Sequence, residues 1–181
     1  MTSGAEKASS SFDHRHRVVV SFIYQLPLAK DPPIWLQRIL GHWQAGRNFT
    51  AQSGAPFTVN ISSDKANVGA GPAQRPKISG DPNAGPKTPL QWFNKSVFSL
   101  PAVYTFGNSP RNTVIVPGLE EFDFSLQKDI QLTEATKLQF RTEAYNVFNH
   151  PNFNIPNRTA FTANVGGISS AQGFPPASVS A

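Results

Sequence analysis

The chain has 181 residues, of which 39% are hydrophobic and 15% charged, and it contains 13 glycines, 16 prolines and 14 phenylalanines. This composition excludes a helical bundle, which carries more Ala, Leu, Glu and Lys and less proline, and the aromatic content excludes a disordered chain. The net charge of +5 is scattered, and there is no cysteine, which excludes disulfides, thiolate nucleophiles and Cys-ligated metals. We expect a β-rich protein with many loops and no nucleic-acid partner.

Regular structure is predicted to begin after a polar lead-in. Residues 1–12 are small and polar, and we interpret them as disordered and without the apolar core of a signal peptide. No run in the chain is long and apolar enough for a membrane-spanning helix. Residues 16–26 then alternate, which predicts a strand, and one of its faces is wholly apolar: Val18, Val20, Phe22, Tyr24 and Leu26.

A second strand follows a proline-rich connection. Residues 27–40 contain three prolines and end in a possible helical turn at 35–40. Residues 42–52 alternate again, with a wholly polar face and an opposite face formed by Trp43, Ala45, Arg47, Phe49 and Ala51. The pattern predicts a strand, but it does not explain the arginine on the apolar face.

A long aperiodic segment separates the second strand from the third. Residues 53–121 are dense in Gly, Pro, Asn and Asp, which is typical of a loop. Residues 92–100 (WFNKSVFSL) form the one stretch of this segment in which we expect local order. A loop of this length is usually functional or disordered.

Two further strands are predicted near the end of the chain. Residues 122–131 alternate strictly, with Phe122, Phe124, Leu126 and Ile130 on one face and Lys128 interrupting it. A brief turn at 132–135 leads to residues 137–149, which alternate again, and residues 150–181 form an irregular tail.

The length and spacing of these strands favour a membrane barrel. Strands of about 10–12 residues exceed the usual length in soluble domains and suit a tilted bilayer crossing. The connections alternate between short and long, as in transmembrane barrels. Aromatic residues near the strand ends are candidates for the membrane-interface girdles: Tyr24, Trp43, Phe122, Phe124 and Phe148. A soluble β-sandwich with core aromatics also fits the alternation, and four strands cannot close a barrel.

The segment LQFRTEAYNVFNHPNF, residues 138–153, closely resembles the penultimate strand and following loop of TonB-dependent outer-membrane receptors. The resemblance is to the Oar-like acidobacterial subgroup, whose members carry a carboxypeptidase-regulatory-like domain. Other stretches resemble this subgroup in the same order: FDHRHR (12–17), GHWQAGRNFTAQSGAPF (41–57), WFNKSVF (92–98), FGNSPR (106–111) and PGLEEFDFSLQKD (117–129).

The resemblance implies an all-β fold in which antiparallel strands form part of a transmembrane β-barrel. Residues 13–149 would be a partial barrel wall that includes the long extracellular loop 53–121, and residues 150 onward would also be extracellular. The family imports large, scarce solutes and is energised by the TonB complex through a plug. The plug, the TonB box and the closing strand with its terminal aromatic residue are not found in this sequence, which ends in GFPPASVSA. The expected partners are outer-membrane lipid, the rest of the barrel and the plug; the solute remains unidentified.

No constellation of residues indicates catalysis, a metal or a cofactor, and we expect none. Asp13, His14 and His16 lack a third ligand at useful spacing. The sequences around Ser53 and Ser79 lack a nucleophile elbow, Glu120 and Glu121 point to opposite faces of a strand, and the glycines at 69 and 71 lack the lysine of a phosphate loop.

Two sets of residues remain as candidates. Arg141 and Glu143 share a strand face and are interpreted as a lumen-side ion pair. Trp92 and Phe93 are possible ligand-contact aromatics of the long loop, with a role as loop anchors as the alternative. The alternative function, of a different class, is a soluble β-sandwich module that binds carbohydrate.

Overall fold

The computed structural model describes residues 7–27, 33–69, 74–133 and 135–171. The first half of the predicted lead-in and the ending GFPPASVSA lie outside these ranges. The chain divides into two compact units. We call residues 17–51 and 120–150 the sheet unit, and residues 7–16, 52–119 and 151–171 the core unit.

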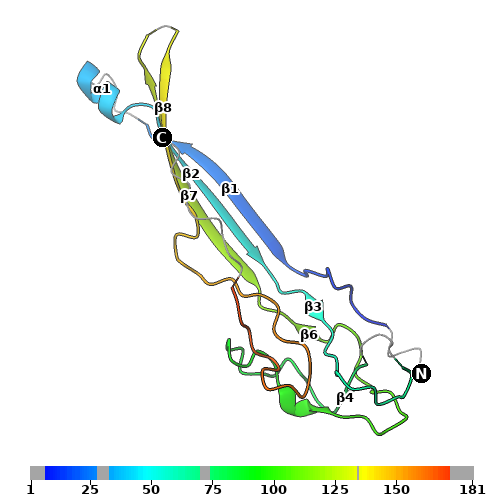
Figure 1. Cartoon of the computed structure of the whole chain (residues 1–181). Coiled ribbons are helices and arrows are strands. Elements are labelled where there is room, and N and C mark those ends of the chain that lie inside the picture. The colour runs from blue at the N-terminus through cyan, green and yellow to red at the C-terminus, as the bar shows by residue number, and fades with distance from the viewer. Residues whose placement is uncertain (1–6, 28–32, 70–73, 134, 172–181) are drawn as a thin grey trace. The chain divides into compact units, whose positions relative to one another are not determined.

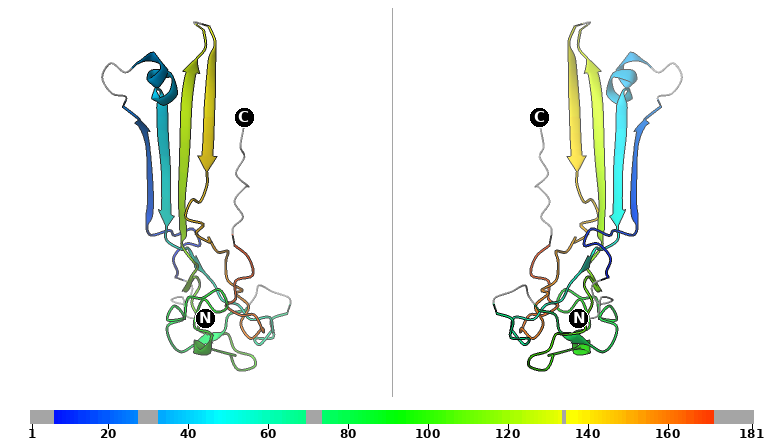
Figure 2. Two further views of the ribbon diagram at one scale, coloured as in Figure 1. Left: turned by 90° about the vertical axis from the view of Figure 1, so that its left-hand side faces the viewer. Right: turned by 90° about the vertical axis from the view of Figure 1, so that its right-hand side faces the viewer.

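The sheet unit is built on four long strands that lie side by side (Figures 1 and 2). They are β1 (Arg17–Gln25), β2 (Trp43–Gln52), β7 (Leu119–Gln131) and β8 (Lys137–Ala144), in the order β1-β2-β7-β8. A short helix, α1 (Ile34–Leu40), precedes β2. The predicted all-β fold of antiparallel strands is confirmed. The sheet formed by the described residues is open, with β1 and β8 at its edges.

The strands begin and end close to the predicted positions, except at two places. Strand β7 begins at Leu119, before the predicted start at 122. Strand β8 ends at Ala144 instead of continuing to 149. Asn146 and Asn149 have φ values of 47° and 50°, and asparagine tolerates this left-handed conformation better than most residues do. The chain therefore turns after β8.

The two faces of the sheet have different chemistry, as the alternation predicts. The register of β7 and β8 places Leu126 opposite Thr142, Lys128 opposite Phe140, and Ile130 opposite Leu138. These residues belong to the apolar face. All nine residues of β1 are exposed, and Phe22 on that face is 50% exposed. The apolar face of β1 is thus not covered by another layer of the described structure.

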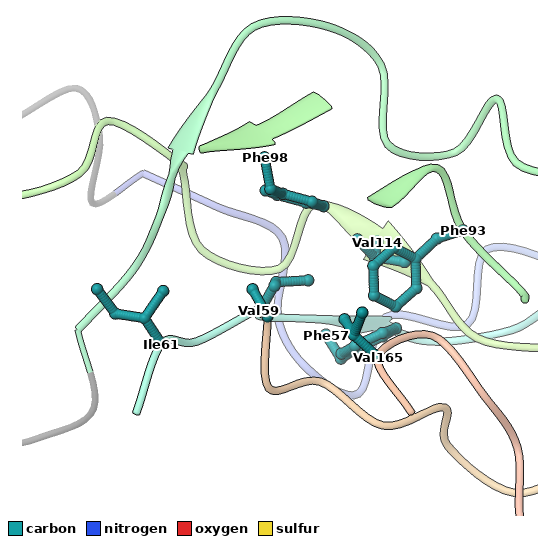
Figure 3. Close-up of a cluster of buried hydrophobic side chains, with 8 residues drawn as sticks. Phe57, Val59, Ile61, Phe93, Phe98, Val114 and Val165 are labelled. Atoms are coloured by element: carbon teal, nitrogen blue, oxygen red, sulfur yellow. The ribbon is translucent and has the colours of Figure 1, made fainter. Parts of the chain in front are cut away.

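The core unit contains only short regular elements. Strand β3 (Pro56–Phe57) pairs with β6 (Val114–Ile115), and β4 (Lys77–Ile78) pairs with β5 (Phe98–Ser99), which follows the 3-10 turn η2 (Lys95–Val97). Eight buried side chains hold the unit together (Figure 3): Phe57, Val59, Ile61, Phe93, Phe98, Val114, Ala160 and Val165. The aperiodic segment thus folds around a hydrophobic cluster rather than through long strands.

This core unit joins the two long connections of the chain. Asn60, from the connection after β2, accepts the N–H of Ala160 and donates its own N–H to Arg158 O, 2.9 Å away. The backbone N–H of Trp92 likewise donates to Gly166 O at 2.8 Å. The segment 92–100, where local order was expected, supplies Phe93 and Phe98 to the cluster. The two connections therefore fold together.

Candidate functional site

A polar groove crosses the face of the sheet opposite the apolar one. It has a volume of about 570 Å³ and is lined by side chains that include Ser21, Asn48, Asp123, Ser125, Glu143 and Tyr145. Ser21 Oγ donates to Asn48 Oδ1 at 2.7 Å across β1 and β2. The lining combines these hydrogen-bonding groups with apolar surface from residues such as Phe22, Ile23 and Phe124, so the groove can offer both hydrogen bonds and apolar contact to a ligand.

The carboxylates of the groove are held in place by neighbouring donors. Glu143 accepts a hydrogen bond from Arg141 Nη2 and another from Tyr145 Oη at 2.7 Å. Asp123 Oδ1 accepts the backbone N–H of Asn146 at 3.1 Å. The side-chain pairing of Arg141 with Glu143 is present, as expected from their shared face. The groove thus keeps a negatively charged side with oriented acceptors.

Glycine 46 forms part of the groove floor. A Cβ at Gly46 would lie only 2.3 Å from Ser125 Oγ on β7. A side chain at position 46 would have to displace the Ser125 hydroxyl and would occupy part of the groove, because a contact below 3 Å requires one of the two groups to shift. The absence of a side chain at position 46 therefore keeps the groove open at its centre.

The candidate girdle aromatics belong to two groups in the sheet unit. Trp43 packs edge-on against Phe140, with ring centroids 6.4 Å apart, and donates its indole N–H to Ile39 O at 3.0 Å. Phe122 packs against Phe148, with centroids 4.9 Å apart. Tyr24 and Phe148 are 55% and 74% exposed, and Phe124 lies on the same face as Phe122. A role at the membrane interface remains a prediction for all five.

The structure supplies the neighbours of the two cations on the apolar face. Lys128 is only 6% exposed, its Nζ donates to Ile39 O, and it lies 5.0 Å from the centroid of the Trp43 ring. The Arg47 guanidinium lies 5.9 Å from the Phe22 ring centroid and 5.8 Å from that of Phe122. Both contacts come from residues far apart in sequence, so the strand pattern alone could not reveal them.

The two ligand-contact candidates of the long loop have different positions. Phe93 is 0% exposed and packs edge-on against Phe57 and Phe98. This burial fits the alternative role of Phe93 as a loop anchor, and a role as a ligand contact remains a prediction. Trp92 is partly exposed and donates its indole N–H to Ile115 O at 2.7 Å.

A cation lies over the Trp92 ring. Lys87 Nζ is 5.2 Å from the ring centroid, within the range of a cation–π contact. Partial burial lowers the pKa of Lys87, and the charge of Asp81 opposes this shift. Trp92 thus presents one hydrogen-bonded edge and a face that a cation already contacts.

A cleft that the sequence analysis missed lies in the core unit. It has a volume of about 500 Å³, and Lys95, Phe98, Phe161 and Thr162 are among its lining residues. Phe161 is 50% exposed and has a φ of 64°, which is an unusual conformation for a bulky residue. Nothing in the local sequence signals it, because the cleft forms only when residues near 95 and 160 come together.

The polar residues near the start of β1 interact with the second connection. His14 Nδ1 lies 2.8 Å from Ser53 O, and Asp13 lies 3.9 Å from Arg15. Among the described residues, no group of three or more His, Cys, Asp or Glu side chains is arranged to hold a metal. No helix in the described ranges is long and apolar enough to cross a membrane.

Comparisons with known proteins agree with the strand architecture. A family model described as an outer membrane beta barrel domain matches residues 2–175. Neither the comparison with curated proteins nor that with solved structures gives a match. The family match covers nearly the whole chain. The long antiparallel strands of the chain, each with two different faces, are typical of a barrel wall. The chain therefore belongs to the outer membrane beta barrel domain family, and it is located in the outer membrane.

Proposed function

We propose that this chain contributes barrel wall and extracellular loops to a TonB-dependent receptor that imports a large, scarce solute. The observation that supports this most directly is the core unit, in which two long connections fold together around a common hydrophobic cluster. A loop assembly with its own core is rigid enough to hold a ligand-binding surface in place. The resemblance of residues 138–153 to the Oar-like subgroup supports the same assignment.

In this proposal the two surfaces of the protein have separate tasks. The core unit captures the solute, with the partly exposed Trp92 and the cleft near Phe161 as contact surfaces. The polar groove faces the lumen, and its oriented acceptors offer hydrogen bonds to a hydrated solute. The proposed activity is transport rather than catalysis.

The proposed partners follow from the open sheet. Strands β1 and β8 have unpaired edges within the described structure, and such edges require further strands in a bilayer. We assign those strands to the rest of the barrel. The plug and the TonB complex act through that remainder, and membrane lipid contacts the apolar face.

The soluble carbohydrate-binding sandwich is not the function of this chain. The family to which this chain belongs is located in the outer membrane. A sandwich would also pack a second sheet against the apolar face, whereas β1 is exposed along its whole length.

The orientation is tested by labelling single cysteines, because the chain contains none of its own. Leu90, in the core unit, and Leu132, after β7, are 90% and 60% exposed. On intact cells, a membrane-impermeant maleimide should label Leu90→Cys and should label Leu132→Cys only after the outer membrane is permeabilised. The reverse pattern would contradict the proposed orientation.

Transport is tested by uptake in cells with and without the protein. The probes are a ferric siderophore, cobalamin and an oligosaccharide, each measured with and without a proton ionophore. Protein-dependent accumulation that the ionophore abolishes would support energised import. Accumulation that is insensitive to the ionophore would indicate a passive pore, and the absence of protein-dependent uptake for all three probes would count against the proposed function.

A further inference from the structure

The short helix α1 presents apolar side chains that the described structure leaves uncovered. Ile34, Trp35 and Ile39 are 71%, 63% and 58% exposed. Successive helical residues are about 100° apart, so these three lie within an arc of about 140°, which we call the apolar side of α1. A helix of seven residues is marginal in water by itself, and a contiguous apolar side of this kind indicates a partner.

Another side of α1 faces polar groups. Gln37 lies about 200° from Trp35 around the helix axis. It lines a pocket of about 280 Å³ together with Gln25, His42 and Asp129. Gln25 and Asp129 belong to the rows of their strands opposite the apolar ones. The helix is therefore amphipathic, with hydrogen-bonding groups beside Gln37 and exposed apolar groups on the apolar side.

Two hydrogen bonds attach α1 to the apolar face of the sheet. The backbone oxygen of Ile39 accepts from Lys128 Nζ and from Trp43 Nε1, the latter at 3.0 Å. Lys128 and Trp43 belong to the apolar rows of β7 and β2. Figures 1 and 2 show α1 beside the strand ends, standing off one face of the sheet. The helix therefore projects from the apolar face.

The position of α1 along the strands corresponds to a membrane boundary. Trp43 is the first residue of β2, and β1 ends nearby at Gln25. These strands have 10 and 9 residues, and about 9–11 residues cross a bilayer. Of the four strands of the sheet, β7 and β8 continue beyond this level, and their last pair is the polar Gln131 with Lys137. In an outer-membrane protein, α1 is thus attached where acyl chains give way to headgroups.

We propose that α1 is an interfacial helix whose apolar side inserts into the membrane lipid at this end of the sheet. Tryptophan favours this depth, because its ring is apolar and its N–H is polar. The helix sequence IWLQRIL contains no acidic residue and its one charge is basic, as is usual for helices on a lipid surface. The same lipid then covers the apolar face of the sheet and the apolar side of α1. Insertion depends neither on the transported solute nor on which leaflet lies at this end.

A depth measurement at two positions of α1 tests this proposal, because the chain has no cysteine of its own. Trp35→Cys and Gln37→Cys, both at exposed positions, are labelled with a nitroxide in outer-membrane preparations. Power-saturation EPR measures collisions with oxygen, which concentrates in lipid, and with nickel ethylenediaminediacetate, which stays in water. The ratio of oxygen to nickel accessibility should be higher at position 35 than at position 37.

The other outcomes of this measurement overturn the proposal. A low ratio at both positions would place α1 in water, and a high ratio at both would place the whole helix among acyl chains. Low accessibility of position 35 to both reagents would show that protein, rather than lipid, covers the apolar side.

The fluorescence of Trp35 gives a second measurement that requires no label. The chain has three tryptophans, so the double variant Trp43→Phe, Trp92→Phe leaves Trp35 alone. In reconstituted vesicles, Trp35 emission should be weaker with phosphatidylcholine brominated in its acyl chains than with the same lipid without bromine. Equal emission in the two lipids would overturn the proposal. If Trp35→Cys fails to reach the membrane, this comparison still decides.

Discussion

The two units of this protein place the same kind of side chain in opposite environments. In the core unit, Phe93 is 0% exposed, although the surrounding sequence shows no periodicity. In the sheet unit, Phe22 is 50% exposed, although it belongs to a regular apolar row. An exposed apolar row of this extent is unfavourable in water and favourable against lipid. Regular alternation therefore marks the part that the membrane stabilises, and irregular sequence forms the part with its own hydrophobic core.

The largest expected effect comes from a substitution that destabilises the core unit alone. Phe93→Ala removes a fully buried ring that contacts Phe57 and Phe98, so it should destabilise the core unit by about 3–5 kcal/mol. Hydrogen–deuterium exchange on outer-membrane preparations measures this as faster exchange of the Ile61 and Ala160 amides. Leu90→Ala, at a residue that is 90% exposed, is the control and should change little. Equal loss of protection in the sheet unit would show that the two units do not fold separately.

Substitutions at two adjacent valines test the difference between the two faces of the sheet. Val20 and Val19 are 48% and 52% exposed and lie on the apolar and the mixed face of β1. Val20→Lys should lower stability in the bilayer by up to about 2–4 kcal/mol, because it places a charge against lipid, and Val19→Lys should be tolerated. The measurement is the fraction of protein that stays in the outer membrane after a urea wash. Equal losses would show that both faces meet the same medium.

A smaller effect concerns the anchoring of α1 in the sheet unit. Lys128→Met keeps most of the side-chain volume but removes the donor to Ile39 O and the charge over Trp43. Loss of this charged hydrogen bond should cost about 1.5–3 kcal/mol locally. The Gln37 and Gly41 amides, which bond within the helical turn, should exchange faster. Lys137→Met, at the exposed start of β8, is the control and should leave the exchange rates of these two amides unchanged. If Lys137→Met accelerates their exchange equally, the effect does not come from the contact of Lys128 with Ile39.

The smallest effect is a pH dependence confined to the core unit. Burial by itself would raise the pKa of Asp64, but hydrogen bonds from the N–H groups of Val68 and Gly69 and from the Gln74 side chain outweigh it and lower the pKa. A carboxyl with a lowered folded-state pKa stabilises the fold above its unfolded-state pKa, and this contribution is lost as pH falls through the folded-state value.

Amide exchange at Val68 and Gly69, corrected for the intrinsic pH effect, should therefore accelerate as the pH falls through the acidic range in which Asp64 becomes protonated. Asp64→Asn should abolish this pH dependence, because its side chain does not titrate. Protection that stays constant down to the lowest pH at which the sheet unit remains folded would contradict the role of the Asp64 carboxylate.

Much of the sheet could be predicted from sequence because its information is local. Successive residues of a strand point to opposite faces, so the rows containing Phe22 and Phe124 identify both the strand and its apolar side. The end of β8 was less predictable, since the alternation continues past Ala144 while the positive φ of Asn146 turns the backbone.

The candidate sites were only partly predictable. The shared face of Arg141 and Glu143 follows from their spacing, and the pair forms. The burial of Phe93 and the cleft at Phe161 depend on contacts between residues near 57, 93 and 160. Such contacts cannot be predicted from sequence periodicity, because the residues that form them come from separate irregular segments.

By itself, the sequence determined a β-rich chain with long two-faced strands and large glycine- and proline-rich loops. Its alternation fitted both a membrane barrel and a soluble sandwich, and the resemblance of residues 138–153 to outer-membrane receptors favoured the barrel. Only the tertiary structure decided which aromatic residues are buried and which are exposed, and which of the two cations on the apolar face has a partner. Strand alternation is set by backbone geometry within a few residues. Burial and pairing are set by segments that meet only after folding, so Lys128 acquires a carbonyl partner and Arg47 does not.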